Sequence, residues 1–356
     1  MRSISGLLKT IQALQSDGTG AYARGLFPSQ RYHYYLPYQR EDDNLYFTAL
    51  IAFTLTELKN LIPIQDQAKA EEIISLAVRN YYKYKSLSGE DLYNFYQTNP
   101  PKPFPNGHLL KRFESSQLAD DSDCTVMVYL SRNSSETEAL WLKEQLNRNA
   151  NRSQREIKET VEEHRGLRAY SVWLGPPSIP VSFDFCVLCN ILYFVHYYQL
   201  PVSVQDMDSM RYLRSVLTRD EHFQNTYHTA NTYPNTAIIL YHIARLLAGF
   251  HISFLEDLRE KIIFDCQRLI VQTTSSMEKV ILSSSLLKLN AEPAVLINPD
   301  EVDVDSFSFF IAPMLAGKEL PILSKLAKVN WFHIPFRSKA YNLTLLLEYQ
   351  LLKNSK

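Results

Sequence analysis

The sequence predicts an all-α protein, arranged as a single α/α toroid domain over residues 1–356 with an inner and an outer ring of helices. Two observations support this class. Segments that are apolar nearly all round alternate with amphipathic segments, which carry charge on one face only. Helices of the first kind belong inside a fold and helices of the second kind outside it. Glycine is scarce, at 10 of 356 residues, which argues against the many tight turns of a sheet protein.

The apolar segments open with clusters of polar residues that are typical of helix beginnings. Because every inner helix of a toroid begins at the same end, these openings are expected to converge on one mouth of a central cavity. Helix N-termini favour negative charge, so the mouth suits acidic groups and anions. The openings are, in chain order, Asp43 with Asn44, then Asp123, Asp184 and Asn235, and finally a segment that begins near Ser338.

The amphipathic segments are expected at 71–81, 136–147 and 255–270. Proline clusters at 99–107 and 175–180 interrupt the helices and predict loops. Helices of the same types continue on both sides of each loop. The chain is therefore expected to form one domain.

Composition narrows the functional classes. A net charge of −1 and the absence of a Lys or Arg block argue against a nucleic-acid partner and against a membrane surface. The sequence has no uninterrupted run of 18 apolar residues, so no membrane span is predicted. A cytoplasmic location is expected. The pair Cys186 and Cys189 has no second CxxC to complete a zinc site, so no metal site is predicted, and cofactors stay open.

The segment Asp121-Ser122-Asp123-Cys124-Thr125-Val126-Met127 precedes an apolar helix. It resembles the acid motif of class II terpene cyclases, Asp-x-Asp-Asp-Thr-Ala-Met, in which the middle acid protonates an alkene. The resemblance implies that Asp123 is the proton donor and that Asp121 tunes it. Asp120 could replace the second acid, a position that Cys124 occupies here. The alternative is that Asp121 or Asp123 only caps the helix.

Further segments extend the resemblance. Asp184 followed by Asn190, and Tyr233 followed by an apolar helix, resemble inner-helix patterns of the terpenoid cyclase/prenyltransferase superfamily of α/α toroids. The chain is also similar to uncharacterised bacterial squalene-cyclase-like proteins with a single domain. The resemblance implies a hydrophobic, isoprenoid ligand in the central cavity. Class II cyclases commonly place the cavity between two toroids, and this chain has material for one.

Four functions are open at this point. The favoured one is a toroid that binds an isoprenoid or other lipid-like ligand, a peptide or a protein partner without full cyclase activity. The second is a class II terpene cyclase that uses Asp123. A glycoside-processing barrel would pair Asp43 with Asp123. Zinc-dependent prenyl transfer would need Asp184 and Cys186 with His228 or His333. If the ligand carries phosphate, the candidates for an anion contact are Arg31, Arg40 and Arg245.

Overall fold

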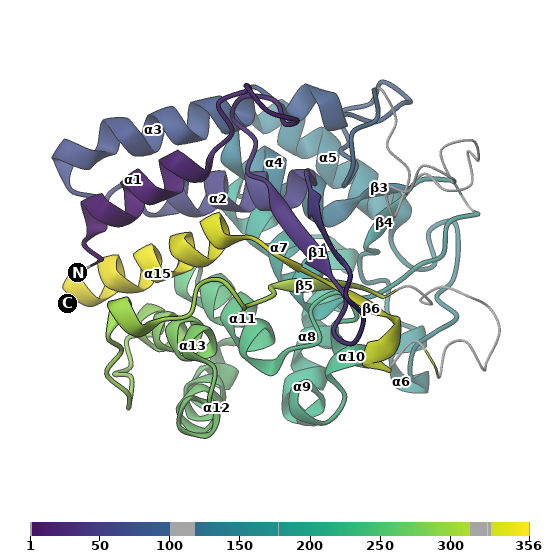
Figure 1. Cartoon of the computed structure of the whole chain (residues 1–356). Helices are drawn as coiled ribbons and strands as arrows, with labels where there is room; N and C mark the ends of the chain where they lie inside the picture. Colours follow the sequence, from purple (N-terminus) through teal and green to yellow (C-terminus); the bar gives the residue numbers. More distant parts are fainter. Residues whose placement is uncertain (1, 100–117, 177, 314–325, 327–328, 356) are drawn as a thin grey trace.

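The computed structural model describes residues 2–99, 118–176, 178–313, 326 and 329–355. Within these ranges the chain is mostly helical, which confirms the predicted predominance of helix (Figure 1). The chain also forms two small antiparallel sheets, which the prediction of an all-α protein left out. The predicted proline-rich loop at 99–107 lies, except for its first residue, outside the described residues.

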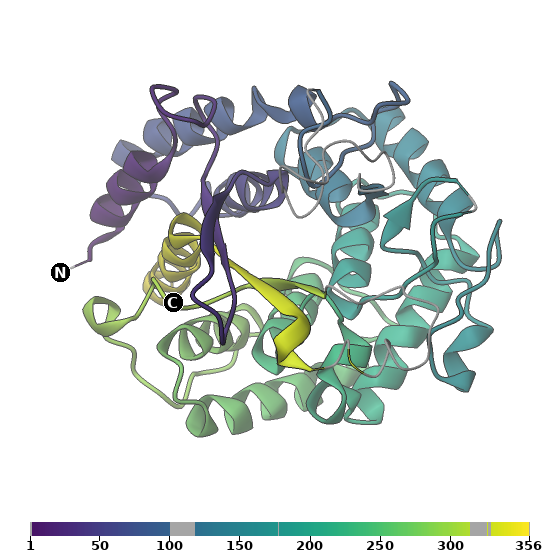
Figure 2. The same cartoon turned by 45° about the vertical axis from the view of Figure 1, so that its right-hand side comes forward.

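Six helices are buried on almost every side, and each packs against the next one along the chain (Figure 2). The last of them also packs against the first, so their contacts close into a circuit. A helix that is apolar all round is stable only in such an interior. We call them the inner helices; they are α2 (Leu45–Glu57), α4 (Ser122–Ser131), α7 (Phe185–Tyr197), α11 (Thr236–Gly249), α13 (Ser276–Lys288) and α15 (Lys339–Asn354).

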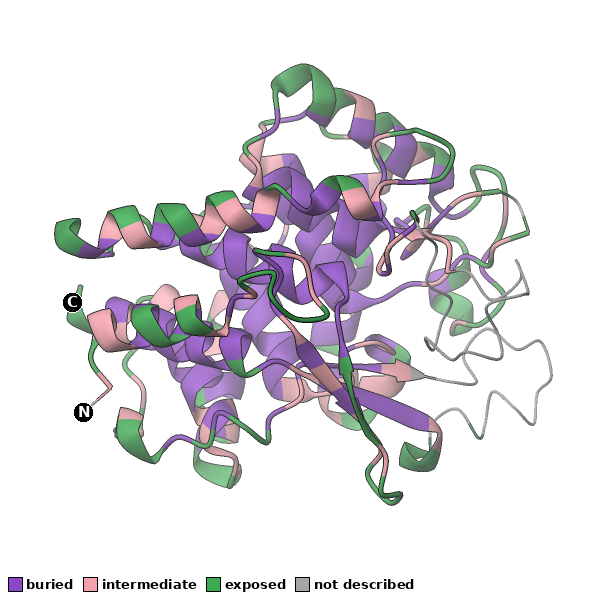
Figure 3. Ribbon diagram, turned by 45° about the horizontal axis from the view of Figure 1, so that its top comes forward, coloured by how far each residue is buried: buried purple, intermediate pink, exposed green. Residues whose placement is uncertain are grey.

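Amphipathic helices surround the inner helices and expose their polar faces to solvent (Figure 3). Helix α3 packs on α2, α8 on α7, α12 on α11 and α13, and α1 on α15. The predicted amphipathic segments overlap α3, α5 and α12. These outer helices are α1 (Ile4–Leu14), α3 (Ile64–Val78), α5 (Glu136–Asn149), α8 (Val204–Thr218) and α12 (Arg259–Gln272).

Each inner helix begins with a polar side chain that accepts a hydrogen bond from a backbone N–H of the first turn. Those N–H groups have no partner within the helix, and burial would leave them without water. The caps therefore allow the helix ends to be buried. They are Asn44, Asp121, Asp184, Asn235, Ser275 and Ser338.

Hydrogen bonds also link the beginnings of neighbouring inner helices to one another. The backbone N–H of Asp121 donates to the carbonyl of Tyr93, which lies beside the start of α2. The N–H of Thr232, just before α11, donates to the capping carboxylate of Asp184. The side-chain amide of Asn235 donates to Glu278, in the first turn of α13. The beginnings of these helices consequently lie side by side.

A four-stranded sheet in the order β2-β1-β6-β5 lies across this end of the inner helices (Figure 2). Its strands are β1 (Ser29–Tyr32), β2 (Gln39–Asp42), β5 (Phe310–Pro313) and β6 (His333–Arg337). β6 leads directly into α15, and β2 leads into α2. At β5, the ring of Phe310 lies 5.5 Å from that of Tyr46 and 4.8 Å from that of Phe47. Phe309 lies 4.8 Å from Tyr341. Aromatic packing thus covers the end at which the inner helices begin.

Short elements complete the connections between the helices. Among them, β3 (Asp120–Asp121) pairs with β4 (Trp173–Leu174) beside the start of α4. None of the helices that the structure describes is both long and apolar enough to cross a membrane. The short elements are η1 (Tyr81–Tyr84), β3 (Asp120–Asp121), α6 (Glu162–Arg165), β4 (Trp173–Leu174), α9 (Glu221–Gln224), α10 (Thr226–Thr229), η4 (Glu256–Leu258), η5 (Pro299–Glu301) and η6 (Asn330–Phe332).

We expect Phe310→Ala to lower the free energy of unfolding by about 3–5 kcal/mol, because the ring is buried against several others and its loss leaves a cavity. The matched control is Phe264→Ala on α12, whose ring is 61% exposed. That change should cost less than about 1 kcal/mol. Unfolding in urea, followed by circular dichroism, measures both. Equal losses in the two variants would contradict a structural role for the aromatic cover.

Candidate functional site

Asp123 is a buried acid at which several predicted site residues meet. It is the second residue of α4 and is 6% exposed. Its Oδ1 accepts a hydrogen bond of 2.6 Å from the side-chain amide of Asn190, in α7. Its Oδ2 accepts one from the hydroxyl of Tyr233, which lies just before α11. Two other predicted residues, Asn190 and Tyr233, therefore donate hydrogen bonds to the carboxyl group of Asp123 from neighbouring parts of the circuit.

Arg245, in α11, continues this chain of hydrogen bonds. Its Nη2 donates to Oδ1 of Asn190, and the residue is 5% exposed. The amide of Asn190 thus donates to Asp123 on one side and accepts from Arg245 on the other, which an amide does through separate nitrogen and oxygen atoms. We call the chain Tyr233–Asp123–Asn190–Arg245 the polar relay. It connects α4, α7 and α11.

Aromatic rings surround the guanidinium of Arg245. Its Cζ lies 5.1 Å from the ring centre of Phe53, 5.6 Å from that of Tyr241 and 5.7 Å from that of Tyr193. These distances are typical of cation–π contacts, which are strongest where water is excluded. The three rings come from α2, α7 and α11, so the cation contacts several walls of the circuit.

Several buried polar atoms beside the relay have no hydrogen-bond partner. Two of them are Nε and Nη1 of Arg245 itself. Such groups are rare in folded proteins because each loses its hydrogen bonds to water without replacement. Others on the inner helices are the hydroxyls of Ser283 and Ser284, Nε2 of His242 and Oδ1 of Asn342. The buried hydroxyl of Tyr46 lies near Asp123 and Tyr233, and that of Tyr341 lies near those of Thr54 and Tyr241.

Burial weakens the acids at this end of the circuit. It raises the pKa of Asp123 above its ordinary value, although the hydrogen bonds from Tyr233 and Asn190 act in the opposite direction. Burial also raises the pKa of Asp121 to about 8 and that of Asp184 to about 7. The charge of Asp123 contributes to both shifts, so ionisation of Asp123 disfavours that of Asp121 and of Asp184.

Asp121 and Asp184 serve as caps of inner helices. Oδ1 of Asp121 accepts from the N–H of Cys124 at 2.6 Å, while its Oδ2 is buried without a partner. Oδ1 of Asp184 accepts from the N–H groups of Cys186 and Val187, and its Oδ2 accepts from Thr232. Neither side chain joins the polar relay.

The other predicted residues have partners of their own. Asp43 accepts from the side chain of Gln97 at 3.0 Å, and Asp120 accepts from the hydroxyl of Ser86 at 2.6 Å. The amides of Asn44 and Asn235 cap their helices and donate to Asp42 and Glu278 respectively. The structure therefore brings Asp123, Asn190 and Tyr233 together and places these four residues in separate hydrogen-bond networks.

Sequence reasoning missed the buried hydroxyls of Tyr46 and Tyr341. Both residues lie in apolar helical runs, where a tyrosine is ordinarily part of the core. A usable signal was the position of each tyrosine within three residues of a capping side chain, at the end where the helix beginnings gather. Arg245 was identified as a candidate anion contact, but not as a partner of Asn190.

One group of metal-compatible donors occurs among the described residues, formed by Asp220, His222 and Asp265. The ammonium of Lys261 donates to Asp220 at 2.6 Å and to Asp265 at 3.0 Å. The two carboxylates therefore already pair with cations of the protein, Lys261 and, at Asp265, also Arg268. We interpret the group as an ion-pair network between α12 and the neighbouring α9, and not as a metal site.

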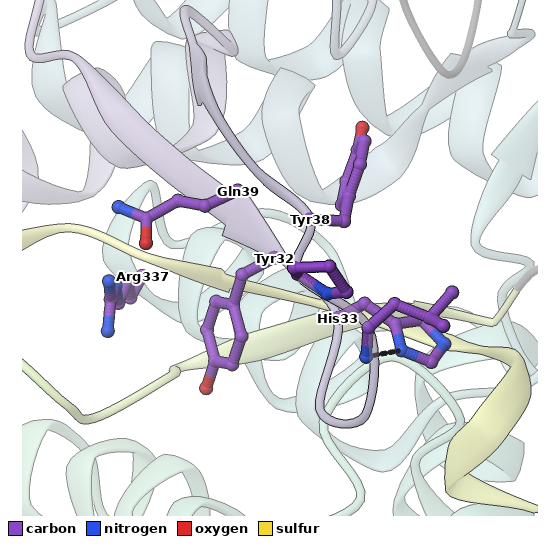
Figure 4. A pocket seen from close by; sticks show the side chains of 7 residues that line it. Tyr32, His33, Tyr38, Gln39 and Arg337 are labelled. Carbon is purple, nitrogen blue, oxygen red and sulfur yellow. Dashed lines mark hydrogen bonds between the residues drawn. The ribbon is translucent and has the colours of Figure 1, made fainter.

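A surface hollow of about 450 Å³ lies on the outer sheet, at the β1–β2 hairpin (Figure 4). Tyr32, His33, Tyr38, Gln39 and Arg337 line it, and the figure shows Tyr32 between Arg337 and His33. None of the relay residues lines this hollow. It is consequently separate from the polar relay.

No protein-family model, curated protein or solved structure matches this chain. The resemblance to terpenoid cyclases therefore depends on the motif residues alone. The geometry of the polar relay is the remaining basis for a function.

The raised pKa values of Asp121 and Asp184 predict how stability depends on pH. A carboxyl group whose folded pKa exceeds its unfolded value stabilises the fold in its protonated form. That contribution is complete below about pH 4 and is lost as pH rises through about 7 for Asp184 and about 8 for Asp121. We expect the urea midpoint of the wild-type protein to fall between pH 5 and pH 8.5.

Asp121→Asn isolates the part due to Asp121, because an asparagine retains an oxygen that can accept from Cys124 but does not ionise. At pH 5, a little above the unfolded pKa, the variant should exceed the wild type in stability by no more than about 2 kcal/mol. At pH 8.5 its advantage should be clearly larger. The control is Asp257→Asn, an exposed residue whose pKa is lowered by Arg214, which should give a constant offset across this range. A wild-type slope that Asp121→Asn leaves unchanged would refute the assignment.

Proposed function

We propose that the chain is one α/α toroid, residues 1–356, that binds a hydrophobic ligand of isoprenoid type on the axis of its inner helices. The observation that carries this proposal is the polar relay, which ends in unpartnered donors within an aromatic interior. Buried groups without partners are expected where a bound molecule supplies the partner. The closed circuit of inner helices, with outer helices packed around it, supports the toroid.

Binding without cyclisation is favoured over the class II cyclase alternative for two reasons. Alkene protonation needs an unusually strong acid, and burial makes Asp123 a weaker one. The rings of Phe53, Tyr193 and Tyr241 could stabilise a carbocation, but they already surround the guanidinium of Arg245. A second positive charge among these rings would be repelled.

One observation keeps the cyclase alternative as a second candidate. Asp123 is buried at a helix N-terminus and accepts hydrogen bonds from Asn190 and Tyr233, which stabilise the carboxylate left after proton transfer. Cys124 stands where the resemblance places a second acid, and burial raises the pKa of its thiol. It therefore supplies no replacement for that acid.

The test compares the wild-type protein with Asp123→Asn. Each protein is incubated with squalene, farnesyl diphosphate and geranylgeranyl diphosphate, with and without magnesium. Products are analysed by mass spectrometry, and thermal unfolding is recorded with each compound. We expect no product and a rise in the unfolding temperature of the wild type. A ligand at about 100 times its Kd stabilises the fold by about 2.7 kcal/mol.

The outcomes separate the two candidates. Product that is lost in Asp123→Asn would establish the cyclase and overturn the binding proposal. Stabilisation without product supports the binding function. The absence of both would refute an isoprenoid ligand of these kinds. Asp66→Asn is the matched control, because it changes a buried carboxyl group to an amide on the outer helix α3, away from the relay.

A further inference from the structure

Arg245 carries a buried positive charge that the protein itself satisfies only in part. Its Nη2 donates to Asn190, whereas Nε and Nη1 have no partner. A guanidinium has five N–H donors and stays charged at any pH that proteins tolerate. A buried charge without compensation is strongly destabilising. A molecule that binds at the open donors would recover part of that cost.

Among the described residues, no neighbouring carboxylate forms a hydrogen-bonded ion pair with the guanidinium of Arg245. Asp123 is attracted to Arg245 electrostatically, but hydrogen bonds connect the two only through the amide of Asn190. Glu348, on α15, accepts from the hydroxyl of Tyr241 at 2.9 Å and pairs with Lys288 at 2.9 Å. The charge of Glu348 is therefore already neutralised by a different cation.

Neutral donors lie around the same guanidinium. The hydroxyls of Tyr46 and Tyr341 are buried, and both residues interact electrostatically with Arg245. The hydroxyl of Tyr46 also interacts with Asp123 and Tyr233, and that of Tyr341 with Thr54 and Tyr241. The hydroxyl of Thr54 is a third, and it lies on α2 beside Tyr341. Water could accept from these groups, but it carries no counter-charge for the guanidinium. An anion provides both the acceptors and the charge.

One cation with neutral donors suits a singly charged anion. A phosphate or diphosphate carries about two or more negative charges at neutral pH, and the charge beyond the first would have no second cation among the described residues to balance it beside Asp123. A carboxylate carries one negative charge and accepts several hydrogen bonds. The aromatic surroundings provide apolar contacts for a hydrocarbon chain attached to it.

We propose that the guanidinium of Arg245 binds the carboxylate of a hydrophobic carboxylic acid inside the circuit of inner helices. This inference rests on the proposed function for the position of the ligand, and it assigns the chemical class of the ligand's polar end. Nε and Nη1 of Arg245 donate to the carboxylate or to water that bridges to it. The hydroxyls of Tyr46, Thr54 and Tyr341 supply further donors.

The test uses pairs of compounds that differ only in the end group. Farnesoic acid is compared with farnesol, palmitate with hexadecanol, and farnesyl phosphate serves as the dianion. Binding is measured by isothermal titration calorimetry at constant ionic strength and pH 7. We expect the wild type to bind each acid about 10- to 100-fold more tightly than its alcohol, as hydrogen bonds to a charged group predict. Farnesyl phosphate should bind more weakly than farnesoic acid.

Arg245→Met should reduce the acid-to-alcohol ratio to about one. Arg245→Lys keeps the charge with fewer donors and should retain an intermediate ratio, and it serves as the second variant if Arg245→Met does not fold. Circular dichroism establishes the fold of each. The control is Arg40→Met, an exposed arginine of β2 beside the surface hollow, which should keep the wild-type ratio.

Equal affinity of the wild type for acid and alcohol would overturn the carboxylate assignment while leaving the isoprenoid function intact. A ratio that survives Arg245→Met but falls in Arg40→Met would overturn it in favour of the surface hollow. If palmitate shows the Arg245-dependent preference and no farnesyl compound binds, the carboxylate assignment holds and the isoprenoid function fails. If neither the farnesyl compounds nor palmitate and hexadecanol bind, the carboxylate assignment and the isoprenoid function are both refuted.

Discussion

A buried cation and a buried acid, joined by a single amide, are the constraint on which the interior of this protein depends. Asn190 can bridge Asp123 and Arg245 only if α4, α7 and α11 keep a fixed rotation and height relative to one another. Apolar packing alone tolerates many arrangements of similar volume. The hydrogen-bonded bridge removes most of that freedom, and the remaining inner helices close the circuit around it.

The same constraint connects stability with function. The capping acids Asp121 and Asp184 allow helix ends to be buried, but they are held in low-dielectric surroundings where ionisation is unfavourable. Arg245 is held by aromatic rings and one amide, which leaves two donors open. Packing by hydrophobic residues of similar size would be less costly than such polar groups. The capping acids satisfy helix ends, whereas the open donors of Arg245 have no such structural role and are the basis of the proposed ligand.

The sequence predicted much of the fold because the apolar and amphipathic patterns follow directly from burial. It did not identify α13 as an inner helix, since Ser283, Ser284 and Ser285 interrupt its apolar run. These serines are nevertheless fully buried, and Ser285 donates to the carbonyl one turn earlier. The short strands were missed because each depends on pairing with distant segments, as β1 does with β6.

The candidate site was predictable only in part. Asp123 and Asn190 stood out as polar residues at or within apolar helices, but their hydrogen bond spans 67 residues of chain. No spacing rule predicts which side chains meet across a circuit of helices. The contacts of Asp43 with Gln97 and of Asp120 with Ser86 likewise depend on loops whose path the sequence does not reveal. Local patterns predict helix beginnings, whereas tertiary packing selects their partners.

The closure of the circuit by α15 against α2 also determines the order in which the protein can be completed during synthesis. The first inner helix leaves the ribosome nearly 300 residues before the partner that closes its open side. Until then the growing chain exposes apolar helix faces on both edges of an incomplete arc. Such intermediates are prone to aggregation, and contacts between distant segments form slowly. The topology therefore leaves an apolar surface available to chaperones until α15 has been made.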